Sequence, residues 1–300
     1  MSKFSIWVNA MRPRTLPLSI SGIVTGSAIA YRYDLFSWNI FIPAILTTVL
    51  LQILSNLAND YGDAQKGSDG QDRIGPQRMV QSGLLSINEI KKGIVILVVL
   101  SLITGIYLLI QAFPNKEFFK FFIFLALGLL AIWAAIKYTV GKSAYGYRGF
   151  GDLFVILFFG FVSVLGSCYL FTSHINALAI FQSLVIGLLS TGVLHLNNMR
   201  DRQSDTRSGK ITLAVKLGFG RSKLYFYALI IIAMMMSLIS AWFYSLHLTD
   251  YLFSISLIPL VILLIQVAKV NEERDFNKFL KPLALNTFLY ATLFFIGFII

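Results

Sequence analysis

The sequence predicts an all-α, polytopic membrane protein with nine transmembrane helices around a central cavity. Of its 300 residues, 57% are hydrophobic and only 13% are charged, a balance that is not typical of soluble globular domains. Predominantly apolar runs recur along the chain, and each has about the 20 residues that a helix needs to cross roughly 30 Å of hydrocarbon. Because backbone groups cannot stay unpaired in lipid, each run is expected to be helical.

Nine apolar runs are the predicted spans. They cover about residues 16–33, 39–58, 92–112, 119–138, 152–172, 177–197, 224–245, 251–268 and 282–300. The first run follows three basic residues and ends in "SAIA", which imitates a secretion signal. Pro13, Pro17 and the eight later runs instead favour a first helix that is retained.

The placement of the basic residues predicts the orientation. If the N-terminus is cytoplasmic, all but three of the 25 lysines and arginines lie in cytoplasmic segments, and the exceptions are Arg32, Lys116 and Lys120. This bias follows the positive-inside rule. The formal charge of +11 is therefore mostly a signal of topology, and no nucleic-acid partner is expected.

The chain is expected to form one membrane domain, residues 1–300, with a weak internal repeat. Two long polar loops, about 59–91 and 199–223, follow the second and sixth spans. Each begins with an amide–acid cluster, "NDYGDAQKGSDG" and "NNMRDRQSDTRSGK". The pattern indicates two four-helix halves, about 1–140 and 141–270, followed by a ninth helix. Repeats of this kind in membrane proteins often meet at the functional site.

Each cluster places oxygen-bearing side chains on one helix face. At 100° per residue, the first four fall within an arc of about 100° if the second helix runs on through them. The second group is spaced i, i+4 and i+8, which is again a single stripe. The first group comprises Asn56, Asn59, Asp60 and Asp63, and the second comprises Asn197, Asp201 and Asp205.

These stripes indicate a magnesium–phosphate site. Carboxylates at membrane depth are costly, and a divalent cation would remove the repulsion between two acidic stripes that face one cavity. Oxygen ligands without His or Cys suit Mg²⁺, which usually completes its shell with water and substrate phosphates. The same loops supply cations that could bind phosphate: Arg73, Arg78, Arg200, Arg202, Arg207 and Lys210. A single cluster after a membrane helix is usually a solvated loop, but two clusters four helices apart favour a site for a diphosphate on an apolar tail.

The motifs resemble those of the UbiA superfamily of intramembrane prenyltransferases. That family carries two Asp-rich motifs, at the ends of its second and sixth helices, on a nine-helix scaffold. The first motif is matched by Asn59, Asp60 and Asp63, with Asp69 as the third acid although it comes two residues later than in the commonest pattern. The second motif is matched by Asp201 and Asp205, preceded by Asn197 and Asn198.

Finer details are similar to one branch, the 1,4-dihydroxy-2-naphthoate polyprenyltransferases of menaquinone synthesis. The segments that carry this resemblance are "NDYGDAQKGSD", "GPQRMVQSGLLS", "YTVGKSAYGYRGFGDLFVILFFG" and "NNMRDRQSDTRSGKITLAVKLG". The resemblance implies Mg²⁺ bound by Asn59 and the Asp motifs, a polyprenyl diphosphate donor and a dihydroxynaphthoate acceptor. It further implies loss of diphosphate and CO₂, a demethylmenaquinone product, and an active site on the cytoplasmic side of a bacterial inner (plasma) membrane.

The segment 137–154 is open to two interpretations. The resemblance places Tyr138 and Lys142 at the mouth of the cavity and makes Arg148 a candidate for substrate binding, whereas composition alone favours an interfacial aromatic belt. His195, within the sixth span, is either a catalytic base or a histidine that has satisfied hydrogen bonds or lines the pocket. The acids of the last cytoplasmic loop, Glu273 among them, are expected to be solvated.

Two other functions are considered. A cation-coupled transporter would carry acids in the middle of its spans, whereas here the acids sit at helix ends. A sister enzyme of the same superfamily would prenylate another acceptor, such as 4-hydroxybenzoate, homogentisate or haem, and the "GPQR" and "YRGFGD" segments favour the naphthoate branch over it.

Overall fold

The computed structural model describes residues 2–66, 78–114, 117–141 and 143–300, and the regular elements in these ranges are helices. The α-helices are α1 (Lys3–Met11), α2 (Leu16–Arg32), α3 (Trp38–Lys66), α4 (Ile87–Ala112), α5 (Phe118–Lys137), α6 (Gly151–Val155), α7 (Ser167–Thr172), α8 (Ala177–Arg200), α9 (Arg202–Arg207), α10 (Leu213–Tyr244), α11 (Leu257–Ala268) and α12 (Asn277–Ile299). A π-helical stretch, Ile156–Gly166, joins α6 to α7. Short 3₁₀ turns cover Pro13–Thr15, Tyr145–Arg148, Leu248–Ser256 and Glu273–Phe276. The prediction of an all-α membrane protein is confirmed.

The predicted spans correspond to the long helices. Eight helical segments of the described residues are long and apolar enough to cross a membrane. The first predicted span corresponds to α2, whose 17 residues extend about 25 Å, a little less than the hydrocarbon thickness. The count of nine spans therefore stays a prediction.

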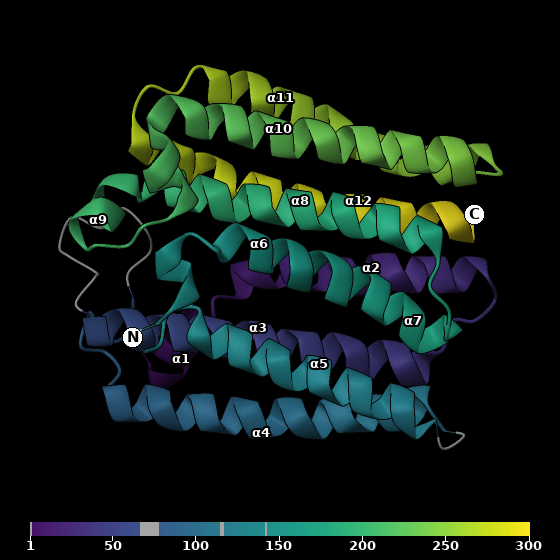
Figure 1. Cartoon of the computed structure of the whole chain (residues 1–300), viewed down its shortest axis with the longest axis horizontal. Coiled ribbons are helices and arrows are strands. Elements are labelled where there is room, and N and C mark those ends of the chain that lie inside the picture. The colour runs from purple at the N-terminus through teal and green to yellow at the C-terminus, as the bar shows by residue number, and fades with distance from the viewer. Residues whose placement is uncertain (1, 67–77, 115–116, 142) are drawn as a thin grey trace.

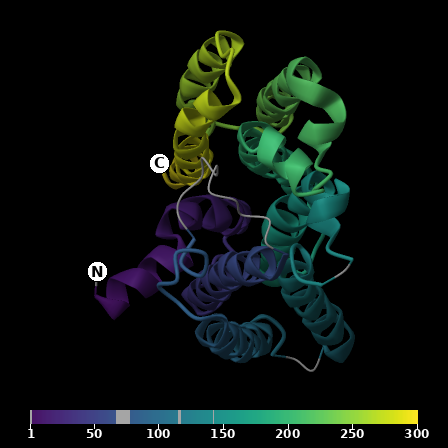
Figure 2. The same ribbon diagram turned by 90° about the vertical axis from the view of Figure 1, so that its left-hand side faces the viewer.

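The long helices run side by side, so that the molecule has two ends (Figure 1). The N-terminus, α9 and the end of α3 that bears the first motif lie together at the left-hand end of this view, and the C-terminus lies at the other end. Figure 2 looks at the left-hand end directly, with the helices seen nearly end-on. Helix α12 packs against α2 and α8, while α8 also packs against α10 and the π-helical stretch. The described parts of the loops predicted to be cytoplasmic thus share one end of the bundle.

Local sequence explains where several helices begin. Ser86 and Glu89 form a reciprocal capping box at the start of α4, in which the Ser86 backbone N–H donates to Glu89 Oε2 at 2.9 Å. Thr212 caps α10 by accepting a hydrogen bond from the Val215 backbone N–H at 3.3 Å. Gly218 then interrupts α10 with φ 75°, a conformation that disfavours residues with a side chain. The cap and the kink fix the chain that returns from the second acidic motif to the bundle.

Candidate active site

Helix α3 carries the first acidic motif without a break, since it runs to Lys66. The expected single stripe therefore forms, and Asn56, Asp60 and Asp63 are buried with 3%, 1% and 4% of their surfaces exposed. The Asn56 side-chain amide donates to the Met11 carbonyl oxygen at 2.9 Å and to Thr15 Oγ1 at 3.0 Å. Asn56 thus fastens the N-terminal segment to α3, which brings Arg12 over the motif.

Both described acids of the first motif contact an arginine. Arg12 donates to Asp60, and Arg78 donates to Asp63 and lies with its Nε 3.9 Å from Asp60. Arg78 also donates to the Asn59 carbonyl oxygen at 2.9 Å. Arg12 reaches this position from a left-handed backbone conformation, φ 52°, which costs energy for a residue with a side chain. Because buried carboxylates are stable only when they are paired, these arginines are part of the site.

Close packing holds the tip of α3 against the end of α5. Thr139 donates to the Ala58 carbonyl oxygen at 3.0 Å and to Asn59 Oδ1 at 3.2 Å. A Cβ atom on Gly62 would lie only 2.8 Å from the Thr139 carbonyl carbon. The glycine of "NDYGD" therefore allows the backbones to approach, and it orients the asparagine of the motif.

The turn Tyr145–Arg148 joins the two motifs. The Tyr147 hydroxyl donates to Asp63 Oδ1 at 2.6 Å, and the Tyr147 carbonyl oxygen accepts from the Ile211 backbone N–H at 3.0 Å. The Lys66 ammonium lies 3.6 Å from the centre of the Tyr147 ring. This turn ends at Gly149, whose φ of 84° favours glycine. Tyr147 consequently orients a carboxylate of the first motif from a turn that is fixed to the second.

We expect the Tyr147→Phe variant to lose activity while it stays folded. Loss of a hydrogen bond to a charged group costs about 1.5–3 kcal/mol, so that kcat/KM should fall by about ten- to a hundredfold. Tyr145→Phe is the matched control, because the Tyr145 hydroxyl donates to the neutral Ala134 carbonyl oxygen at 2.9 Å. Steady-state rates and melting curves of both variants in detergent provide the measurement. Equal rates for the two variants would contradict the role given to Tyr147.

The second motif lies where α8 passes into α9. Asp201 has non-helical backbone angles and separates the two helices. The helical backbone hydrogen bonds nevertheless continue through it. The Asp201 N–H donates to the Asn197 carbonyl oxygen at 3.1 Å, and the Asp205 N–H donates to the Asp201 carbonyl oxygen at 2.8 Å. The expected stripe of Asn197, Asp201 and Asp205 is therefore nearly preserved across a bend.

Arg200 pairs with Asp201. Its Nε and Nη2 atoms donate to the two carboxylate oxygens at 2.7 and 2.6 Å. Further donations go to Asn197 Oδ1 at 2.7 Å and to Asn277 Oδ1 at 2.9 Å, so that Arg200 connects α8 with the first residue of α12. With 3% of its surface exposed, Arg200 is a buried contact between the end of α8 and the start of α12.

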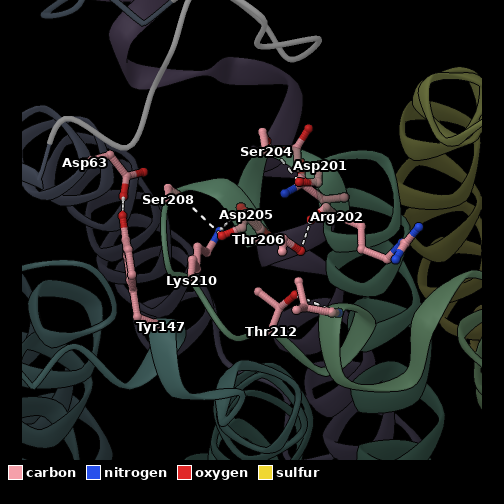
Figure 3. A network of polar contacts seen from close by, with 12 residues as sticks. Asp63, Tyr147, Asp201, Arg202, Ser204, Asp205, Thr206, Ser208, Lys210 and Thr212 are labelled. Atoms are coloured by element: carbon pink, nitrogen blue, oxygen red, sulfur yellow. Dashed lines mark hydrogen bonds and ion pairs between the residues drawn. The ribbon is translucent and has the colours of Figure 1, made fainter.

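Asp205 and Lys210 lie beside Asp63 and Tyr147 in Figure 3. The Lys210 ammonium is 3.2 Å from Asp205 Oδ1. Burial raises the pKa of Asp205 to about 6, with Asp201 and Asp63 acting in the same direction against Lys210. Burial lowers the pKa of Lys210, but the carboxylates of Asp205, Asp63 and Asp201 outweigh it and hold that pKa above its ordinary value. The two motifs therefore share one electrostatic site.

Tyr138 borders the same acids. Burial raises its pKa, and the charges of Asp152, Asp205 and Asp63 raise it further. The ring packs against Gly146 and Gly151, since a Cβ atom on either would come within 3.0 or 3.3 Å of it. Tyr138 is thus held as a neutral phenol, which can donate a hydrogen bond or offer its ring to a cation but is unsuited to be a base.

The oxygen ligands fit Mg²⁺ completed by other ligands. Asp205 Oδ2 and Asn198 Oδ1 are buried and have no hydrogen-bond partner among the described residues. In the part of the chain that the structure describes, no group of three His, Cys, Asp or Glu side chains is close enough to hold an ion alone. Mg²⁺ commonly takes only one or two carboxylates together with water and phosphate oxygens, which agrees with this arrangement.

The structure does not place every residue named from the sequence in this site. Asp69, Arg73 and Lys142 lie outside the described residues. Arg148 is exposed, and its backbone carbonyl oxygen accepts from Lys216 at 3.3 Å, so its position offers no support for substrate binding. The expectation that Glu273 is solvated is wrong, because it is 9% exposed and accepts from Arg202 Nε at 2.5 Å.

His195 is fully buried away from solvent. Its Nε2 lies 3.2 Å from the Ser222 carbonyl oxygen and its Nδ1 lies 3.5 Å from Asp152 Oδ2. Tyr225 packs edge-on against the ring. Full burial and the Nε2 contact favour a buried histidine between α6, α8 and α10 over a base, although His195 Nδ1 and Asp152 Oδ2 have no hydrogen-bond partner among the described residues.

The sequence analysis did not assign a role in the site to Tyr147, Asn277 or Arg12. Tyr147 lies in the "YGYR" segment, whose aromatic residues also fit an interfacial belt, so the sequence did not indicate its contact with Asp63. Asn277 lies 77 residues from Arg200, and nothing in local spacing signals that contact. For Arg12 the sequence gives no decisive signal, because a basic residue just before the first span fits the positive-inside rule equally well.

Comparison with known proteins identifies the family. The model of the UbiA prenyltransferase family matches residues 19–295. The chain belongs to the UbiA prenyltransferase family. It is therefore a prenyltransferase and an integral membrane protein, which confirms the resemblance inferred from the two motifs.

Two relatives of this UbiA prenyltransferase carry the same name, 1,4-dihydroxy-2-naphthoate octaprenyltransferase. The protein from Haemophilus influenzae is 40% identical over 300 residues, which cover 99% of this chain and 97% of the relative. The protein from Escherichia coli K12 is 41% identical over 293 residues, which cover 97% and 91%.

Solved structures support the fold. A UbiA homolog from Archaeoglobus fulgidus, solved bound to GPP and Mg²⁺, aligns over 98% of this chain and 100% of its own with a TM-score of 0.65 at 15% identity. A digeranylgeranylglyceryl phosphate synthase aligns over 100% and 98% with a TM-score of 0.59 at 19% identity. At these identities the likeness concerns the arrangement of helices.

Proposed function

We propose that this prenyltransferase transfers a polyprenyl group from polyprenyl diphosphate to 1,4-dihydroxy-2-naphthoate, with Mg²⁺ as cofactor. Diphosphate and CO₂ would leave, giving the demethylmenaquinone skeleton in its quinol form. The observation that carries the proposal is the meeting of Asp63 and Asp205 at one end of the bundle, each beside a basic side chain. The acceptor is proposed from the names of the two relatives that align over nearly the whole chain.

The proposed orientation follows from charge. The end of the bundle that bears the motifs is also the end with most lysines and arginines, and the positive-inside rule assigns it to the cytoplasmic side. We propose a bacterial inner membrane as the location, with donor and acceptor meeting at the cytoplasmic rim. The polyprenyl tail would extend among apolar helices, which provide the low-polarity surroundings that it requires.

The residues divide into metal-holding and phosphate-holding groups. Asp63 and Asp205 would be the principal carboxylates that hold Mg²⁺, with Asp60, Asp201, Asn59 and Asn198 beside them. The ion when bound would supply positive charge to the diphosphate as it leaves. Arg12, Arg78 and Lys210 would bind phosphate oxygens, because each already lies against a motif acid. Charge on the departing oxygen is thereby stabilised by groups fixed before the reaction.

The reaction balances without a base. Heterolysis of the allylic carbon–oxygen bond leaves its electron pair on diphosphate and a cation on the prenyl carbon. Attack by the electron-rich ring at the carbon bearing the carboxylate forms the new carbon–carbon bond, and loss of CO₂ returns the electron pair to the ring. Tyr138, held as a neutral phenol, would support the cation with its ring, and apolar packing would exclude water from it.

A direct assay tests this proposal. Purified full-length protein in detergent is incubated with Mg²⁺, a polyprenyl diphosphate and one acceptor, and the products are identified by mass spectrometry. We expect a decarboxylated prenyl product with dihydroxynaphthoate, none with 4-hydroxybenzoate or homogentisate, and loss of product on addition of EDTA with recovery on excess Mg²⁺. Prenylation of 4-hydroxybenzoate or homogentisate alone would overturn the acceptor, and full activity in EDTA would overturn the metal.

A further inference from the structure

Lys210 occupies the point where the two motifs meet. Its ammonium lies 3.2 Å from Asp205 Oδ1, and its backbone N–H donates to the Asp205 carbonyl oxygen at 2.8 Å. The same ammonium lies 5.7 Å from the centre of the Tyr147 ring, whose hydroxyl donates to Asp63 at 2.6 Å. Figure 3 shows Lys210 between the Asp63–Tyr147 pair and Asp205. A positive charge is thus already present where two carboxylates converge.

The carboxylate next to Lys210 is only partly satisfied by it. Lys210 contacts Oδ1, whereas Asp205 Oδ2 is buried without a hydrogen-bond partner among the described residues, as is Asn198 Oδ1. Asp205 is 6% exposed and Asn198 is 3% exposed, so bulk water does not compensate these oxygens. The unpartnered Oδ2 makes Asp205 suited to accept a second cation.

We propose that the Lys210 ammonium is an internal counter-ion of Asp205, which Mg²⁺ displaces and which then pairs with the diphosphate. This inference rests on the proposed function, because it requires that Asp205 binds the metal. Lys210 keeps its charge throughout, and only its partner changes, from a carboxylate oxygen to a phosphate oxygen.

The physical consequence is cooperative binding. A divalent cation and an ammonium at one carboxylate repel each other, and this repulsion weakens metal binding when no anion is present. Diphosphate alone is likewise disfavoured, since it must compete with Asp205 for Lys210 and would lie beside the Asp205 carboxylate after that carboxylate had lost its counter-ion. When both bind, each cation gains an anion. Such coupling is reciprocal, and each ligand should raise the affinity of the other by the same factor, about 5- to 150-fold.

The contrast with Arg200 explains why Lys210 is the group that moves. Arg200 is held by Asn197 and Asn277 in addition to Asp201, and it is 3% exposed. Lys210 bears a compact charge on a flexible stem with three rotatable donors, and 14% of its side chain is exposed. A lysine can therefore change partner at smaller cost than a guanidinium that is fixed by a planar set of hydrogen bonds.

The test is a metal titration of the full-length protein in detergent without acceptor. Binding of Mn²⁺, used as a spectroscopic substitute for Mg²⁺, is followed by electron paramagnetic resonance, with and without an unreactive prenyl thiolodiphosphate. Titrations without protein correct for chelation by the analogue. The variants are Lys210→Gln, Lys210→Arg and the control Lys216→Gln, because Lys216 contacts the Arg148 carbonyl oxygen in the same region.

We expect the affinities of the Lys210→Gln variant for the metal and for the diphosphate analogue to change in opposite directions. Metal binding without analogue should tighten by about five- to tenfold, while the analogue should bind more weakly and the coupling factor should fall towards 1. Lys210→Arg should keep most of the coupling, and Lys216→Gln should match the wild type. Unchanged or weaker metal binding in Lys210→Gln would overturn the proposal, and so would a wild type without coupling. A wrong acceptor would leave these titrations unaffected, so the two failures are distinguishable.

Discussion

We expect the Asp63→Asn variant to lose prenyl transfer by about 10²–10³-fold in kcat/KM, the range seen when one preorganised charge-stabilising group is removed. Asparagine keeps the size of the side chain. Its single amide oxygen can still accept from Arg78 and its NH₂ group can donate to the Tyr147 hydroxyl, so that the negative charge and one ligand oxygen are lost. Asp205→Asn should have an effect of the same size, because Asp205 carries the buried, unpartnered Oδ2. Rates are measured in detergent with saturating Mg²⁺, and thermal unfolding reports whether each variant is folded.

The matched control is Asp34→Asn. Asp34 is exposed and has a left-handed backbone, φ 58°, which asparagine also tolerates. It follows α2, at the end of the bundle opposite the motifs. Its rate should equal that of the wild type. If Asp63→Asn or Asp205→Asn retained a near-normal rate while folded, the corresponding carboxylate would have no part in binding metal.

The sequence predicted the elements whose signal is local. Nine apolar runs anticipated the long helices closely because hydrocarbon thickness fixes their length. Helical spacing likewise predicted the stripe of Asn56, Asp60 and Asp63, because α3 continues through the motif to Lys66. The bend at Asp201 was not predicted, since a helix boundary of one residue leaves no trace in spacing.

The partners of the acids depend on long-range packing and could not be read from the sequence. Arg12 reaches Asp60 across 48 positions, and Arg202 reaches Glu273 across 71. Positive-inside topology placed these residues on one side of the membrane, but it does not tell which base faces which acid. Glu273 was for that reason expected to be solvated, although it is buried beside Arg202. The residues of the site were largely predictable from the sequence, whereas the contacts between particular acids and bases were not.

The Arg200→Gln variant tests whether burial makes an ion pair contribute strongly to the stability of the fold. In the structure Arg200 holds Asp201 at 2.6 Å with 2% of the arginine side chain and 11% of the aspartate side chain exposed. Removal of the guanidinium leaves a buried carboxylate without its charged partner, and we expect a loss of about 3–5 kcal/mol in the free energy of unfolding. The double variant Arg200→Gln/Asp201→Asn should recover part of this loss, because it removes the unpaired charge as well.

The Arg274→Gln variant is the comparison, because its ion pair has the same length as that of Arg200 but is exposed, so that only the effect of burial on stability differs. Arg274 and Glu272 also lie 2.6 Å apart, but their side chains are 68% and 58% exposed. An exposed pair is screened by water, and its loss should change stability by less than about 1 kcal/mol. Chemical unfolding in detergent measures both variants on one scale. Similar losses for Arg200→Gln and Arg274→Gln would show that Arg200 does not fasten α8 to α12, and the second motif would then owe its position to the surrounding apolar packing.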